Sequence, residues 1–133
     1  MTLASGPFEV KFTPLALSDP SADGSLGRLA IDKQYHGDLE ATGTGEMLTA
    51  GSAATGSAGY VAIERITGKL KGREGSFVVQ HNGIMNRGAP SLTVTVVPDS
   101  GTGQLAGLSG SFAVKIEQGK HLYEFEYELG EVR

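Results

Sequence analysis

The sequence contains no cysteine in its 133 residues. This absence excludes disulfide bonds, thiolate nucleophiles, and zinc or iron–sulfur sites held by cysteine. The chain also has no basic surplus, because 11 Lys and Arg residues stand against 15 Asp and Glu residues, for a formal net charge of −4. Non-specific binding to nucleic acid depends mostly on cations that neutralise phosphates. Nucleic acid is therefore not an expected partner.

Long hydrophobic runs are missing as well. No stretch approaches the ~18 consecutive apolar residues of a membrane-spanning helix. The first residues, MTLASGPFEVKF, reach Glu9 and Lys11 without the basic start or the apolar run of a signal peptide. We therefore expect no membrane partner and a cytoplasmic location.

Helical periodicity is absent, whereas glycine is abundant. No window of ten or more residues shows a persuasive 3.6-residue period. The 20 glycines are spread along the chain without the period of collagen, which is typical of turns between short strands. With 39% hydrophobic and 20% charged residues the chain is apolar enough to fold, and its length favours one domain over residues 1–133.

Alternation of apolar and polar residues predicts the strands. From residue 7 onward, Phe8, Val10 and Phe12 occupy one parity and Glu9 and Lys11 the other. Further strands are predicted in two parts of 28–39, then at 60–66, 75–81, 92–97, 112–117 and 121–129, with a short hairpin turn at 118–120. Small and polar residues predict a loop at 17–25 and a mobile connection at 49–59.

Seven to nine antiparallel strands are expected to close into a barrel, because closure removes unpaired strand edges. About eight strands leave a lumen that side chains fill or that holds one small ligand. A two-sheet β-sandwich is the alternative, since periodicity does not separate these two architectures.

An internal repeat is the clearest sequence signal. GKLKGREGSFVVQ at 68–80 aligns without gaps on GQLAGLSGSFAVK at 103–115, with seven identical positions. Each copy is interpreted as a hairpin in which glycines supply positive φ angles. Phe77 and Phe112 then occupy equivalent core positions.

Two polar side chains fall on faces that are expected to point inward. Glu64 shares its parity with Tyr60 and lies opposite Val61, whereas His81 shares the parity of Phe77. Both are interpreted as lumen residues.

The last strand separates an aromatic face from an acidic face. Its glutamates, Glu124, Glu126 and Glu128, are expected to face solvent or lysines, because carboxylates buried together would need several buried cations. The side chains expected to line the lumen and bind a ligand are Tyr60, Glu64, His81, His121, Tyr123, Phe125 and Tyr127.

Glu64 and His81 are the candidate catalytic residues. Among apolar neighbours, Glu64 is expected to have a pKa above the ~4.3 of free glutamate and to exchange protons near neutral pH. A nearby Arg or Lys would instead lower this pKa and make a structural ion pair. No metal site is expected, because His36, His81 and His121 lie 45 and 40 residues apart and form no ligand motif. No cofactor is expected.

Four strings carry a resemblance to a known family. They are GRLAIDKQYHGDLEATGTGEML at 27–48, YVAIERITGKLKGREGSFVVQHNG at 60–83, VVPDSGTGQLAGLSGSF at 96–112 and GKHLYEFEYEL at 119–129. Together they resemble the bacterial DUF3224 family. The resemblance implies an antiparallel barrel of the allene oxide cyclase-like kind, whose relatives include cyclases and dirigent proteins that steer reactive apolar intermediates. It implies no established activity.

Three functions remain open at this point. The first is a small β-barrel that binds a small apolar or amphipathic molecule in its lumen. The second is a cofactor-free cyclase or isomerase that uses the same lumen, with Glu64 or His81 transferring a proton. The third is a structural or interaction protein whose core is filled. A homo-oligomer is left open.

Overall fold

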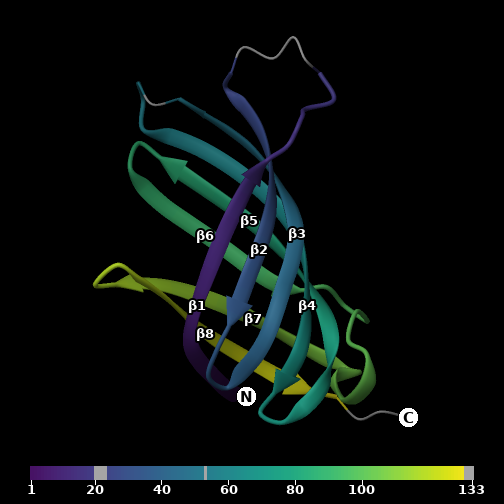
Figure 1. Ribbon diagram of the computed structural model, residues 1–133. Coiled ribbons are helices and arrows are strands. Elements are labelled where there is room, and N and C mark those ends of the chain that lie inside the picture. Colours follow the sequence, from purple (N-terminus) through teal and green to yellow (C-terminus); the bar gives the residue numbers. More distant parts are fainter. Residues whose placement is uncertain (20–23, 53, 131–133) are drawn as a thin grey trace.

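Eight antiparallel strands, each paired with the next along the chain, close into a barrel in which the last strand returns to the first (Figure 1). The computed structural model describes residues 1–19, 24–52 and 54–130. The strands are β1 Thr2–Pro14, β2 Leu26–Tyr35, β3 Leu39–Ser52, β4 Ser57–Leu70, β5 Arg73–Asn86, β6 Ala89–Val96, β7 Leu108–Glu117 and β8 Lys120–Leu129, with a short 3₁₀ helix, η1, at Gly103–Leu105. The predicted all-β closed barrel is confirmed. Within the described ranges, no helix is long and apolar enough to cross a membrane.

Three connections are two-residue hairpin turns that end in glycine. Their first residues are Lys71, Arg87 and Gln118, with φ of 47°, 47° and 50°, and the glycine that follows each also has a positive φ. Two successive positive φ values define the turn whose twist matches that of the flanking strands. The predicted hairpin at 118–120 is confirmed, and the same dipeptide pattern sets the registers of β4–β5 and β5–β6.

The predicted mobile connection at 49–59 is wrong for most of its length. β3 and β4 stay paired as far as Ser52 opposite Ser57, and Ala50 lies opposite Gly59. Small side chains gave no strand signal, but strand pairing needs only backbone donors and acceptors. Residue 53 in this prediction and residues 20–23 in the predicted loop at 17–25 lie outside the described residues.

Side-chain orientation follows the predicted parity. On β4, Glu64 is buried whereas Val61 and Ile63 are about half exposed on the outer face. On β8 the aromatic side chains are buried, while Glu126 and Glu128 face solvent. Glu124 forms an ion pair with Lys115 on β7, and Lys115 has a pKa raised by that contact. The acidic face of the last strand is therefore on the outside.

The core at one end of the barrel is aromatic. Phe77 and Phe112 are 0% and 8% exposed with their rings stacked at 6.4 Å, and Phe125 stacks on Phe112 at 4.0 Å. The two phenylalanines of the repeat are thus core neighbours, as predicted. The second copy is not a hairpin, however, because Leu105 belongs to η1 and not to a strand. Leu105 is buried, and the preceding Thr102 is hydrogen-bonded to Ser76 of β5.

The other end of the barrel has an incomplete wall. β8 pairs with β1 only through Thr2–Phe8, although β1 continues to Pro14. β7 pairs with β6 at only two positions, Val94 with Phe112 and Thr95 with Ser111. The β7–β8 hairpin therefore joins β1 to β6 in one half of the barrel only. In the other half, no strand of the described part of the chain lies between β1 and β6 to pair with them (Figure 1). We call this second half the open half.

Candidate functional site

A buried carboxylate lies at the boundary between the aromatic core and the open half. Glu64 on β4 is 0% exposed. Its Oε1 accepts hydrogen bonds from Lys33 Nζ at 3.0 Å and, with Nε2 as the donor, from His81 at 2.9 Å. Its Oε2 accepts one from the Tyr35 hydroxyl at 2.6 Å. We call these four residues the Glu64 cluster.

A glycine on the neighbouring strand makes room for this carboxylate. Gly43 on β3 lies opposite Ile66, one inward position along β4 from Glu64. A Cβ atom built at Gly43 would overlap Glu64 Oε2 and crowd the ring of Tyr35. The missing side chain at Gly43 is thus what allows the Tyr35–Glu64 hydrogen bond to form inside the barrel.

The predicted rise in the pKa of Glu64 is wrong. Burial alone would raise this pKa, as expected, but the His81 hydrogen bond, the Lys33 ammonium and the Tyr35 hydroxyl together lower it below its ordinary value. Glu64 is therefore a carboxylate at neutral pH and forms the ion pair that was the stated alternative, with Lys33 as the cation. It cannot serve as a proton donor near neutral pH.

Lys33 and Tyr35 are the members of the cluster that sequence reasoning missed. Both lie on the inward parity of β2 with the buried Ile31. Burial first, and then the charge of Glu64 and the hydrogen bond to it, raise the pKa of Tyr35 far above its ordinary value, so its hydroxyl stays protonated and donates. The Lys33 ammonium also lies 5.3 Å and 5.8 Å from the ring centroids of Phe8 and Tyr35. Aromatic faces at this distance attract a cation, so the rings add to the stabilisation of the ammonium by Glu64.

One ring nitrogen of His81 has no hydrogen-bond partner within the described part of the chain. Among the residues that the structure describes, Glu64 is its hydrogen-bond partner, through Nε2. Among the described residues, no buried side-chain nitrogen or oxygen lacks a partner. Nδ1, which has none, is therefore not fully enclosed, although His81 as a whole is only 5% exposed. His81 points inward on β5, so this nitrogen meets solvent inside the barrel.

The remaining predicted site residues divide between the two halves. Tyr60 is partly buried with its ring centroid 6.3 Å from that of His81, and burial followed by the charge of Glu64 raises its pKa. Gly83, opposite Tyr60, provides the space for the tyrosine ring. His121 is partly exposed, 5.3 Å from the ring of Phe8, at the last pair between β8 and β1.

Tyr123, Phe125 and Tyr127 instead belong to the aromatic core, outside the open half. The Tyr123 hydroxyl donates to the carbonyl of His36 at 2.6 Å and accepts from the amide of Leu39 at 2.9 Å, which fixes the β2–β3 turn. Burial raises the pKa of Tyr123 to about 12. We therefore build the candidate site on Tyr60, the Glu64 cluster and His121.

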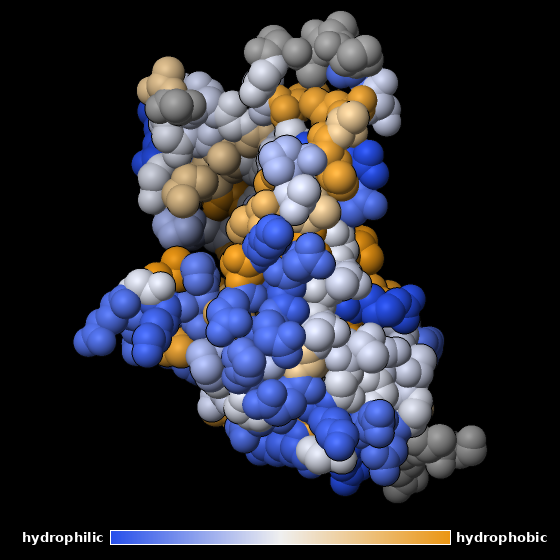
Figure 2. Space-filling model, viewed as in Figure 1, coloured by the Kyte–Doolittle hydropathy of each residue, from blue (hydrophilic) through white to orange (hydrophobic). Residues whose placement is uncertain are grey.

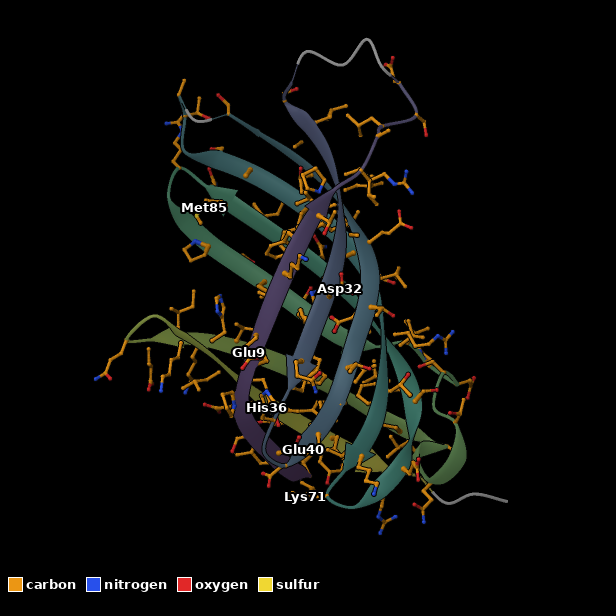
Figure 3. The ribbon with its side chains drawn as sticks, viewed as in Figure 1. Glu9, Asp32, His36, Glu40, Lys71 and Met85 are labelled. Atoms are coloured by element: carbon orange, nitrogen blue, oxygen red, sulfur yellow. The ribbon has the colours of Figure 1, made fainter. Side chains whose placement is uncertain are left out.

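Apolar side chains line the open half and keep contact with solvent. Phe12, Leu92 and Met85 have inward parity but are 49%, 41% and 38% exposed. Met85 lies near the tip of the β5–β6 hairpin (Figure 3). Figure 2 shows hydrophobic surface at the notch between this hairpin and the β7–β8 hairpin. Val10, Leu29 and Met47 are partly buried on the same inner face.

A cavity of about 1170 Å³ lies on the outside of the barrel wall, over β2 to β5. Its apolar lining includes Leu48, Val61 and Ile63, and within it Arg28 Nε donates to Glu46 Oε1 at 2.8 Å. None of the Glu64 cluster lines this groove. The outer groove is thus separate from the inner site.

The three histidines lie in separate places. His36 faces Glu9 and Glu40 on the surface, with nitrogen–oxygen distances of 3.4 Å and 3.7 Å (Figure 3). Among the described residues no group of three or more His, Asp or Glu side chains is arranged to hold a metal ion.

Comparison with known proteins points to one family. No curated protein matches the sequence. A crystal structure of a protein with unknown function from the DUF3224 family of Shewanella oneidensis MR-1 is 51% identical, with a TM-score of 0.94 and 99% of each chain covered. The family model for DUF3224, described as a protein of unknown function, matches residues 4–127. The chain therefore belongs to the DUF3224 family.

Proposed function

We propose that the protein binds a small, mainly apolar molecule with one polar group in the open half of the barrel. The observation that carries this proposal is the partial exposure of Phe12, Met85 and Leu92 on the inner face, above a buried polar cluster. A site for a small molecule is usually an apolar concavity with a few convergent polar groups. The apolar lining would cover the body of the ligand, and the polar group would meet the solvent-facing nitrogen of His81.

The unclosed wall supports this proposal because it gives a ligand a way in. Beyond Phe8, β1 has no pair on the side of β8, and β6 has no pair with β7 beyond Val94. A molecule entering between these strands would not need to break a hydrogen-bonded strand pair.

Binding of N-phenyl-1-naphthylamine, an uncharged apolar dye, tests the proposal. We expect its fluorescence to rise on binding to the wild type at neutral pH, and Leu92→Asp to weaken binding at least tenfold, because a carboxylate would replace apolar lining. Ile63→Asp is the matched control, since Ile63 is similarly exposed but lies in the outer groove. Circular dichroism checks that both variants fold.

Two results would count against the inner site. If the wild type does not bind the dye, the open half is not an apolar site. If Ile63→Asp abolishes binding and Leu92→Asp does not, the dye occupies the outer groove.

A cofactor-free isomerase or cyclase is the second candidate. The specific observation in its favour is the hydrogen bond between the Glu64 carboxylate and His81, which leaves the other ring nitrogen facing the proposed ligand. The closed eight-stranded antiparallel barrel also supports, at the level of architecture, a relationship to the allene oxide cyclase-like superfamily. The cytoplasmic location stays a prediction from the sequence.

A further inference from the structure

We propose that His81 is a catalytic base acting through Nδ1 on an apolar ketone that carries a hydrogen on the carbon next to its carbonyl group. Glu64 is its positioning residue, and the Tyr60 hydroxyl binds the ketone oxygen. This inference rests on the proposed binding site and adds the substrate class and the division of roles.

Glu64 fixes which nitrogen of His81 is basic. An ionised carboxylate only accepts hydrogen bonds, so the hydrogen between Glu64 Oε1 and His81 Nε2, which lie 2.9 Å apart, belongs to Nε2. In the neutral ring Nδ1 then carries the lone pair. Lys33 and Tyr35 hold the same carboxylate in place, so the imidazole has a fixed acceptor behind it.

One hydrogen-bond donor, Tyr60, lies beside the ring of His81. The two ring centroids are 6.3 Å apart, and the Tyr60 hydroxyl is protonated at neutral pH, as a tyrosine ordinarily is, with burial raising its pKa further. Lys33 shares Glu64 Oε1 with His81 Nε2, so it supports the positioning carboxylate. Hydrogen-bond donors placed where an oxygen gains negative charge are the usual means of stabilising an enolate.

The reaction needs no second substrate. Nδ1 takes the proton from the α-carbon, and the C–H electron pair forms the carbon–carbon double bond of an enolate while the carbonyl oxygen takes the negative charge. The imidazolium returns the proton to the α-carbon or, in a β,γ-unsaturated ketone, to the γ-carbon. The second outcome moves the double bond into conjugation with the carbonyl group and restores neutral His81.

The tautomer of His81 is the first measurement. Long-range ¹H–¹⁵N correlation spectra of the ¹⁵N-labelled wild type should show His81 with hydrogen on Nε2 and none on Nδ1 at pH values where the ring is neutral. Glu64→Gln should lose this single tautomer, a signature that a merely structural role for Glu64 would not produce. Hydrogen on Nδ1 in the wild type would overturn the assignment whether or not Glu64→Gln folds.

Turnover is the second measurement, with cyclohex-3-en-1-one as the probe. Proton NMR in deuterium oxide should show α-hydrogen exchange and conversion to cyclohex-2-en-1-one at least tenfold faster with wild type than with His81→Gln. His36→Gln is the control, since His36 lies on the surface with Glu9 and Glu40, and should match the wild type. If wild type and His81→Gln give equal rates while the dye still binds, the base is refuted and the binding function stands. If the wild type neither binds the dye nor converts the ketone faster than His81→Gln, the binding site itself is refuted.

Discussion

Replacing Lys33 by methionine tests whether the buried ion pair is what holds Glu64 in its ionised form. Lys33→Met keeps most of the side-chain volume but removes the cation 3.0 Å from Oε1 of a carboxylate that is 0% exposed. Breaking a buried pair by removing one partner typically costs ~3–5 kcal/mol. Because the carboxylate keeps its hydrogen bonds to His81 and Tyr35, we expect the lower end, about 3 kcal/mol at neutral pH.

The pH dependence gives this prediction its sign. The folded pKa of Glu64 is lowered, so its contribution to stability is present above the unfolded pKa of ~4.3 and is lost as the pH falls through the folded value. Without Lys33 the carboxyl group protonates at a higher pH than in the wild type. The stability difference between wild type and Lys33→Met should therefore be largest at neutral pH and shrink toward about pH 4.

Urea unfolding followed by circular dichroism measures these free energies. Lys115→Met is the control, because Lys115 pairs with Glu124 on the outer surface and an exposed pair adds little. The double variant Lys33→Met/Glu64→Gln should be more stable than Lys33→Met, since it no longer buries an unpaired charge. The reasoning is refuted if Lys33→Met is no less stable than Lys115→Met, or if the double variant shows no recovery.

Three further outcomes follow from the packing. Phe77→Ala should cost ~3–5 kcal/mol in urea unfolding, because the ring is fully buried in the aromatic core, and a small change would contradict its core role. Gly43→Ala should destabilise the fold more than Gly59→Ala, because the new Cβ at 43 would overlap the Glu64 carboxylate, whereas the one at 59 would only touch Cδ1 of Ile84 at 3.4 Å. Equal losses of stability would contradict the role given to Gly43. Tyr35→Phe should reduce the loss of stability above about pH 10, because a raised folded pKa contributes stability below the unfolded value that is lost as the pH rises. Identical alkaline curves would contradict that assignment.

The orientation of the site residues was predictable, because alternation along one strand is a local property. Glu64 and His81 are buried on the inner face, as their parities predict. The partner of Glu64 was not predictable, because Lys33 lies 31 residues away in the sequence. The two side chains meet only when β3 pairs with both β2 and β4. Lys33 shares its parity with Ile31 and Tyr35, but lysine is rarely buried, so the pattern alone did not mark it as a core partner. The wrong sign for the pKa of Glu64 follows from that missing cation.

The repeat shows the same division between local and non-local information. Its identical residues place Phe77 and Phe112 in the core, because both begin an inward face after Gly-Ser. The surrounding backbone differs, since Leu70 ends β4 directly before a two-residue turn whereas Leu105 lies in η1, well after β6 has ended at Val96. Similar strings thus specify the strand that follows them and leave the preceding connection undetermined.

The open half arises from unequal strand lengths, a property that single-strand patterns do not contain. β1 has 13 residues, but its pairing with β8 stops at Phe8, where the β7–β8 hairpin approaches its turn. Burying apolar area stabilises a fold by roughly 25 cal/mol per Å². A longer β7–β8 hairpin would cover Phe12 and Leu92 and gain that free energy, yet both remain 40–50% exposed on the inner face. The apolar ligand proposed above would gain the same burial on binding, because it would cover the side chains that the short hairpin leaves exposed.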